Sequence, residues 1–125
     1  MNGTIDAAIL NGTIDAAILE SLRPLGDAFL KELFQTYSGY AREQLELLRG
    51  ALAAADGTAF CRRLHALRGA SLGVGAAGVA SACRTAEDAL AFPRSIPRRR
   101  QLEAIESELG RALAALAEIS GGLRP

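Results

Sequence analysis

Apolar residues recur every three or four positions along most of the chain, and polar residues fill the positions between them. The longest run lies between residues 27 and 54 and contains Leu30, Leu33, Phe34, Tyr37, Ala41, Leu45, Leu48 and Leu52. Because an α-helix has about 3.6 residues per turn, this spacing gathers the apolar side chains on one face. It predicts a long amphipathic helix, within which we expect Gly39 to be tolerated.

Three further segments, at about residues 58–73, 78–91 and 98–120, show the same period. Their expected inward positions are Phe60, Leu64, Leu67, Ser71 and Val74; Val79, Cys83, Ala86 and Leu90; and Leu102, Ile105, Leu109, Leu113 and Leu116. Turn-forming glycines and prolines separate the segments, at residues 24–26, 55–57, 73–78 and 93–97. The pattern predicts an all-α fold, an antiparallel up-down four-helix bundle with a short extra N-terminal helix.

Polar residues stand where these helices should begin. A side chain at this position can accept a hydrogen bond from a free amide of the first turn. We expect Asp27 to cap the long helix, Asp56 or Thr58 to cap the second, and Ser95 to cap the last. The triplet at residues 98–100 is all arginine, which is unfavourable at the positive end of a helix dipole. We interpret this triplet mainly as a solvated face, with partner contact as the alternative.

Residues 2–10, NGTIDAAIL, are repeated without a change as residues 11–19. The second copy runs into a continuing helical pattern (Ile14, Ala17, Ile18, Ser21 and Leu22), so we expect it to form the first helix of the domain. Residues 1–10 are then a duplicated extension, and residues 11–122 form the domain. Asn11-Gly12 should interrupt any helix through both copies. A duplication without a role is the simpler interpretation; an arm that docks Ile5, Ile9 and Leu10 on a neighbour is the alternative.

The charge balance limits the classes of partner. The chain has 14 basic and 14 acidic residues, so nothing suggests nucleic-acid binding, which depends on excess positive charge. It contains no signal-peptide pattern and no run of about 18 apolar residues. We expect no direct membrane insertion and a cytoplasmic location, with tethering to the inner membrane inside a larger kinase as an alternative.

The two cysteines suggest neither a disulfide framework nor a zinc site, because they are few and the chain has a single histidine. We expect both to be reduced thiols. Cys83 falls on an inward helical face, whereas Cys61 lies one turn before His65 on an outward face.

The single histidine, His65, is the main candidate for chemistry. At helical spacing it shares an outward face with Arg62, Arg68, Gly69 and Leu72. A glycine inside a helix costs about 1 kcal/mol relative to alanine. Gly69 therefore suggests that open space is needed beside the imidazole.

The segment His65-Ala66-Leu67-Arg68-Gly69-Ala70-Ser71, with the later Gly75-Ala76 and Cys83-Arg84-Thr85-Ala86-Glu87, resembles the signature of bacterial histidine-containing phosphotransfer (HPt) domains. The resemblance covers the histidine helix and the following helix. One position departs from the family pattern, since Arg68 stands where lysine is usual, and arginine offers a planar fork in place of a compact charge.

The resemblance implies a histidine phosphocarrier of a multistep His-Asp phosphorelay, and we expect its parent to be a hybrid sensor histidine kinase. His65 would accept a phosphoryl group from a receiver-domain aspartate and pass it to another. Gly69 would supply clearance, Arg68 and Arg62 positive charge, and Leu72 a docking contact. The partners would be receiver domains of a hybrid kinase and of a response regulator. The domain would need no cofactor of its own, because the receiver supplies magnesium.

Other functions fit less well. A catalytically silent helical adaptor that binds a receiver or dimerises is the alternative, but such a domain would not need to keep His65. A hydrolase using His65 with Cys61 lacks an Asp, Asn or Glu on the same helix to orient the imidazole. The chain has no glycine-rich nucleotide-binding loop, so we do not expect it to be a kinase by itself. We expect Ser71 to serve helix packing or to bond a backbone carbonyl.

Overall fold

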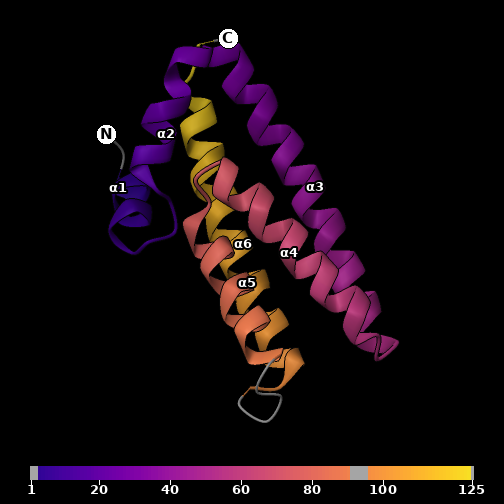
Figure 1. Cartoon of the computed structure of the whole chain (residues 1–125). Helices are drawn as coiled ribbons and strands as arrows, with labels where there is room; N and C mark the ends of the chain where they lie inside the picture. Colours follow the sequence, from indigo (N-terminus) through magenta and orange to yellow (C-terminus); the bar gives the residue numbers. More distant parts are fainter. Residues whose placement is uncertain (1–2, 91–95, 125) are drawn as a thin grey trace.

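A computed structural model describes residues 3–90 and 96–124. Within these ranges the chain forms helices and no strand: α1 (Gly3–Leu10), α2 (Ala16–Leu22), the 3-10 helix η1 (Arg23–Leu25), α3 (Asp27–Ala53), α4 (Gly57–Gly73), α5 (Ala77–Leu90) and α6 (Arg98–Gly121). The long helices α3 to α6 run alternately in opposite directions (Figure 1). The predicted all-α, up-down four-helix bundle is confirmed.

The core lies between the four long helices. Its fully buried side chains include Leu48 of α3, Phe60 and Leu64 of α4, and Ile105 of α6. Four positions predicted to face inward are only partly buried and pack at the edge of this core: Leu33, Leu52, Leu90 and Leu113. Each helix packs mainly against two neighbours, α4 against α3 and α5, and α6 against α5 and α3. These four residues lie at the outer edge of the apolar faces of their helices, so they remain at the rim of the core.

The helix starts differ partly from the predictions. Asp56 caps α4, since its Oδ1 accepts from the Ala59 amide at 3.0 Å. The prediction for Asp27 is wrong: it is the first residue of α3, and its Oδ2 accepts from the Arg124 amide at 3.0 Å. Gly26 occupies the N-cap position with φ +94°, which glycine adopts without strain. Ser95, the predicted cap of α6, lies outside the described residues, and Pro97 occupies that N-cap position.

The two copies of the repeated segment adopt different structures. The first forms α1, whereas the second begins with Thr13 and Ile14, both buried and both outside a helix. Asp15 then caps α2, accepting at its Oδ1 from Ala17 N at 3.0 Å. The prediction that Ile14 lies on the helix is therefore wrong. Tertiary contacts account for the difference, because Thr13 O accepts from the Gly78 amide at 3.2 Å and Asp15 N donates to Gly75 O at 2.8 Å.

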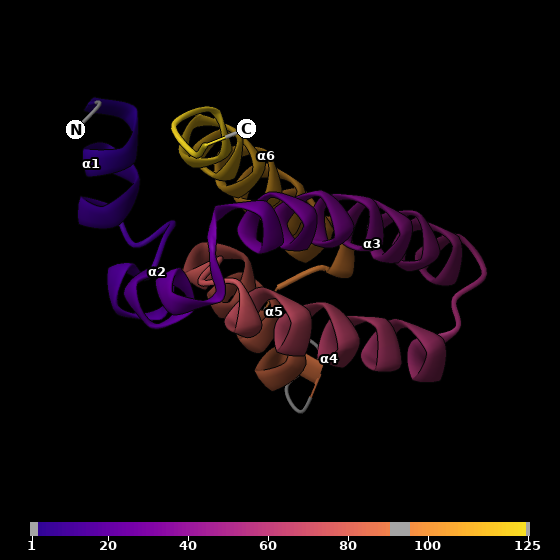
Figure 2. The same cartoon turned by 90° about the horizontal axis from the view of Figure 1, so that it is seen from above.

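The first copy is packed against the bundle. Ala8 is buried, and α1 contacts α6. Figure 2 shows α1 beside the C-terminal part of α6. The turn at Asn11–Gly12 interrupts the helix as predicted, with Gly12 at φ +81°. The fold thus has two short N-terminal helices rather than one, and the division into residues 1–10 and 11–122 stays a prediction.

No helix in residues 3–90 or 96–124 has the length and apolar content needed to cross a membrane.

Candidate functional site

His65 projects from the middle of α4 into solvent. Its neighbours Leu64 and Leu67 are fully buried, and they orient the helix so that its opposite face is turned outward. The His65 side chain retains 73% of its accessible surface. The ring is therefore open to an approaching partner, as the helical spacing predicted.

No bulky side chain stands beside the ring at Gly69. No heavy atom lies within 4 Å of the position that a Cβ of Gly69 would occupy. Leu72, in the next turn, is 53% exposed. Arg62 is also exposed on α4. The four predicted neighbours of His65 thus include three fully outward positions: Arg62, Gly69 and Leu72.

Arg68, the fourth, is held against α5 by a carboxylate. Its Nε lies 2.8 Å from Glu87 Oε1, and its Nη2 lies 3.3 Å from His65 Nδ1. Glu87 Oε2 is itself 3.5 Å from His65 Nδ1. The three side chains therefore form one cluster around Nδ1, which we call the His65 cluster.

Glu87 is the residue that sequence reasoning missed. A search for an orienting carboxylate on the histidine's own helix finds none, because Glu87 comes from α5. It lies within the family-like segment 83–87, one turn after the buried Cys83. That position puts its side chain beside the α4–α5 interface, but only the packing of the two helices brings it to His65.

The cysteines differ in environment, and both are free. Burial raises the pKa of Cys83 to about 12, with a further increase from the nearby negative charge of Glu87 and an opposing effect of Arg68. This thiol stays protonated and serves packing. Cys61 is exposed, as predicted, and borders a groove next to His65.

This groove has a volume of about 630 Å³ and lies between α4, α5 and the start of α6. It is lined by Gly57, Thr58, Cys61, Arg62, His65, Glu87, Leu90 and Arg98. The interpretation of the arginine triplet as a solvated face holds for Arg99 and Arg100, which are exposed. Arg98 is only partly exposed, and its Cζ lies 5.8 Å from the centre of the Phe60 ring.

Ser71 faces the core, as expected, but its bonding differs from the prediction. Its Oγ lies 2.7 Å from the hydroxyl oxygen of Tyr37 on α3, and the residue is fully buried. The partner is a side chain rather than a backbone carbonyl, because α3 brings a tyrosine opposite this position. Burial raises the pKa of Tyr37 to about 12, although the bond to Ser71 acts in the opposite direction.

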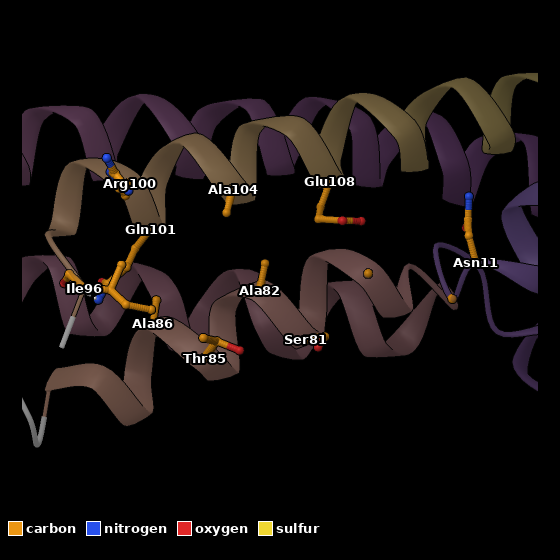
Figure 3. A pocket seen from close by; sticks show the side chains of 12 residues that line it. Asn11, Ser81, Ala82, Thr85, Ala86, Ile96, Arg100, Gln101, Ala104 and Glu108 are labelled. Atoms are coloured by element: carbon orange, nitrogen blue, oxygen red, sulfur yellow. Dashed lines mark hydrogen bonds between the residues drawn. The ribbon is translucent and has the colours of Figure 1, made fainter.

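A second groove, between α5 and α6, carries less chemistry (Figure 3). Its polar lining includes Ser81, Thr85, Gln101 and Glu108, and its remaining walls are largely alanine and glycine. The residues of the His65 cluster do not border it. In the part of the chain that the structure describes, no group of three or more His, Cys, Asp or Glu residues could hold a metal ion.

Comparison with known proteins identifies the family and the fold of the chain. A family model of the Hpt domain matches residues 32–120. The fold is similar to the crystal structure of histidine-containing phosphotransfer protein B (HptB) from Pseudomonas aeruginosa PAO1, with a TM-score of 0.82 and 23% identity over 90% of this chain and 97% of that chain. No curated protein matches the chain by sequence. Hpt domains interact with receiver domains and are phosphocarriers rather than catalysts. The chain belongs to the Hpt domain family and is a histidine phosphocarrier of phosphorelays.

Proposed function

We propose that His65 carries the phosphoryl group, which it takes from an aspartyl phosphate on one receiver domain and gives to an aspartate on another. The observation that carries this proposal is the exposure of the chain's single imidazole, 73% of whose side chain is open to solvent beside the bare backbone at Gly69. In-line attack on phosphorus needs such access on one side of the nucleophile.

The transfer step follows from the two ring nitrogens. Nδ1 lies in the His65 cluster, so Nε2 is the nitrogen left to attack. Its lone pair forms the P–N bond while the P–O bond to the donor aspartate breaks and that aspartate leaves as a carboxylate. The ring keeps its proton on Nδ1 and becomes cationic. The same step in reverse passes the phosphoryl group to the second receiver.

Glu87 favours this arrangement. A carboxylate can only accept hydrogen bonds and a guanidinium can only donate them, so Glu87 Oε2, 3.5 Å from Nδ1, favours a proton on Nδ1, whereas Arg68 Nη2, 3.3 Å from the same nitrogen, opposes it. We propose that Glu87 prevails, because Arg68 can donate to Glu87 Oε1, which lies 2.8 Å from its Nε. The same negative charge stabilises the imidazolium that forms when Nε2 is phosphorylated. Glu87 is therefore a positioning residue for the nucleophile.

The arginines supply positive charge to the product. A phosphoryl group adds roughly −1.5 to −2 charge near neutral pH. Arg68 Nη2 lies 3.3 Å from Nδ1, so its positive charge is near a phosphoryl group on the Nε2 of the same ring, and Glu87 holds this guanidinium beside His65. Arginine can offer two parallel N–H donors to phosphate oxygens, where the lysine usual in the family is a point charge.

The rest of the outward α4 face is the proposed docking surface. Gly69 leaves room for the partner's backbone, and Leu72 offers an apolar contact. Magnesium would come with the receiver, whose own carboxylates would hold it, since this ion prefers oxygen ligands.

We further propose that the donor is the receiver domain of a hybrid sensor kinase and the acceptor that of a response regulator, both in the cytoplasm. The support is the family role of the chain. An upstream kinase core and receiver in the same reading frame would identify the parent as a hybrid kinase, and an isolated reading frame would refute it.

His65→Gln tests the assignment, because glutamine keeps a polar side chain but cannot carry the phosphoryl group as histidine does. The wild type should acquire acid-labile, base-stable phosphate from phosphoramidate and from a phosphorylated receiver, and the variant should acquire none from either. Intact-mass spectrometry and acid treatment provide the measurements. Phosphate on the variant, or none on the wild type with phosphoramidate and a panel of receivers, would refute the assignment.

A bulky substitution at Gly69 separates the phosphorylation of His65 from the docking of a receiver domain. Gly69→Leu should accept phosphate from phosphoramidate, which is small, but should lose most transfer from the receiver. Gly110→Leu is the matched control, because Gly110 is also a helical glycine with no heavy atom near its Cβ position, but it lies on α6. Equal receiver transfer by the two leucine variants would remove Gly69 from the docking surface.

A further inference from the structure

We propose that Arg62 and Arg98 form a cationic docking surface, beside His65, for the carboxylate-rich rim of a receiver's phosphorylation site. The inference rests on the proposed role of His65. It extends the contact from α4 to the first turn of α6, which sequence reasoning had assigned mainly to solvent.

The two arginines border the same groove as His65. Arg62 lies on α4, whereas Arg98 is the first residue of α6, and the groove of about 630 Å³ runs between them. A partner that reaches the imidazole from this side must pass both guanidinium groups.

Arg98 is held in position on the groove wall. Its guanidinium lies over the face of Phe60, with Cζ 5.8 Å from the ring centre, a distance at which a cation–π contact is favourable. Gly57 makes room for it, because a Cβ on this residue would lie 3.2 Å from Arg98 Nη2. The contact with Phe60 thus places this charge on the wall of the groove.

Neither charge has an ion-pair partner in the part of the chain that the structure describes. Among residues 3–90 and 96–124, the ion pairs of the structure include Arg23, Arg49, Arg68 and Arg111 but neither Arg62 nor Arg98. A cation in the first turn of a helix is also unfavourable beside the positive end of the dipole. Among the residues that line the groove, the only carboxylate is that of Glu87, which is paired with Arg68, so Arg62 and Arg98 leave the groove with an excess of positive charge.

The orientation of Arg98 is specific to this groove. Arg100 borders the groove between α5 and α6, in which Figure 3 labels it, and Arg99 borders a groove beside Arg49. Of the three consecutive arginines, Arg98 is therefore the one that faces the phosphoryl site.

The chemistry of a receiver fits this surface. A site that transfers phosphate from an aspartate with magnesium must gather carboxylates, because the ion is bound by oxygen ligands and usually by one or two carboxylates. Its rim is therefore acidic. Opposite charges across an interface raise the association rate and suppress wrong partners.

The test measures transfer from a phosphorylated receiver that donates to the wild-type chain. Arg98→Glu should lower the second-order rate constant by about three- to tenfold at low salt, and the loss should shrink at high salt. Arg98→Lys, which keeps the charge, should stay within about twofold of the wild type. Arg42→Glu is the charge-matched control, since Arg42 borders a groove between α3 and α6 away from His65.

Phosphoramidate is a small donor that needs no docking surface, so it tests the role of His65 separately from the role of Arg98. All variants should react with phosphoramidate at the wild-type rate, because the charge acts on docking. Equal transfer rates for Arg98→Glu and Arg42→Glu would overturn the docking surface while leaving His65 as the carrier. Loss of retention on heparin by Arg98→Glu, without loss of receiver transfer, would assign the surface to a polyanion and also overturn the proposal.

Discussion

At the level of single residues, the surroundings of His65 Nδ1 depend on a contact between two helices. The imidazole belongs to α4, while the carboxylate next to its Nδ1 belongs to α5. The same carboxylate holds Arg68 at 2.8 Å. One glutamate thus lies beside both the proposed nucleophile and Arg68, so its removal should affect both.

Glu87→Ala should slow phosphoryl transfer to His65 about tenfold, equivalent to about 1.4 kcal/mol, because the carboxylate beside Nδ1 is lost. Glu87→Gln keeps an acceptor oxygen and should recover part of the rate. Nitrogen NMR of labelled His65 should show less of the Nδ1–H tautomer in the alanine variant than in the wild type. An unchanged tautomer ratio with a slow rate would contradict the positioning role and indicate a structural one.

At the level of elements, the repeated segment shows that one sequence can form two structures. Both copies contain the same Thr-Ile-Asp, yet Thr13 and Ile14 pack outside a helix against the α4–α5 turn. The first copy instead forms α1, which packs against α6. Its residues Ile5 and Ile9 border an apolar hollow with Leu30 and Phe34 of α3.

Deletion of residues 2–10 should preserve the bundle and phosphorylation of His65, because Met1 would then precede an intact second copy. Loss of the packing of α1 should lower the free energy of unfolding by about 1–3 kcal/mol, from the apolar surface of Ala8, Ile5 and Ile9. Urea denaturation of both chains measures the difference. Equal stabilities would show that α1 contributes nothing to the fold.

At the level of the whole molecule, three helices place polar side chains in the interior. Tyr37 of α3 bonds Ser71 of α4, and the buried thiol of Cys83 comes from α5. Burial raises the pKa of both Tyr37 and Cys83 to about 12. The native bundle therefore excludes the charged forms of both groups.

The burial of Tyr37 and Cys83 predicts a loss of stability at alkaline pH. The ordinary pKa values are 9.0 for the thiol and 10.0 for the phenol, so the unfolded chain releases these protons first. Because both pKa values are raised on folding, stability is complete below about pH 9 and falls as the pH rises toward about 12.

The measurement is urea denaturation of the wild type and of Cys83→Ala and Tyr37→Phe at pH 7.5 and at about pH 11, in reductant. Each variant should lose less stability over this interval than the wild type, although each starts lower because its buried side chain is altered. A parallel fall in all three chains would show that other groups control the alkaline transition.

The helices, the outward direction of His65 and the open place at Gly69 follow from local spacing, because helical periodicity depends only on neighbouring residues. The same spacing predicted that Cys83 and most of the other core residues face inward. Glu87 at Nδ1, Arg98 on the groove wall and the bond between Tyr37 and Ser71 depend on how separate helices pack. The different structures of the two identical segments also depend on packing, since only the second segment reaches the α4–α5 turn. Such contacts between distant residues leave no period in the chain, and only the assembled bundle brings them together.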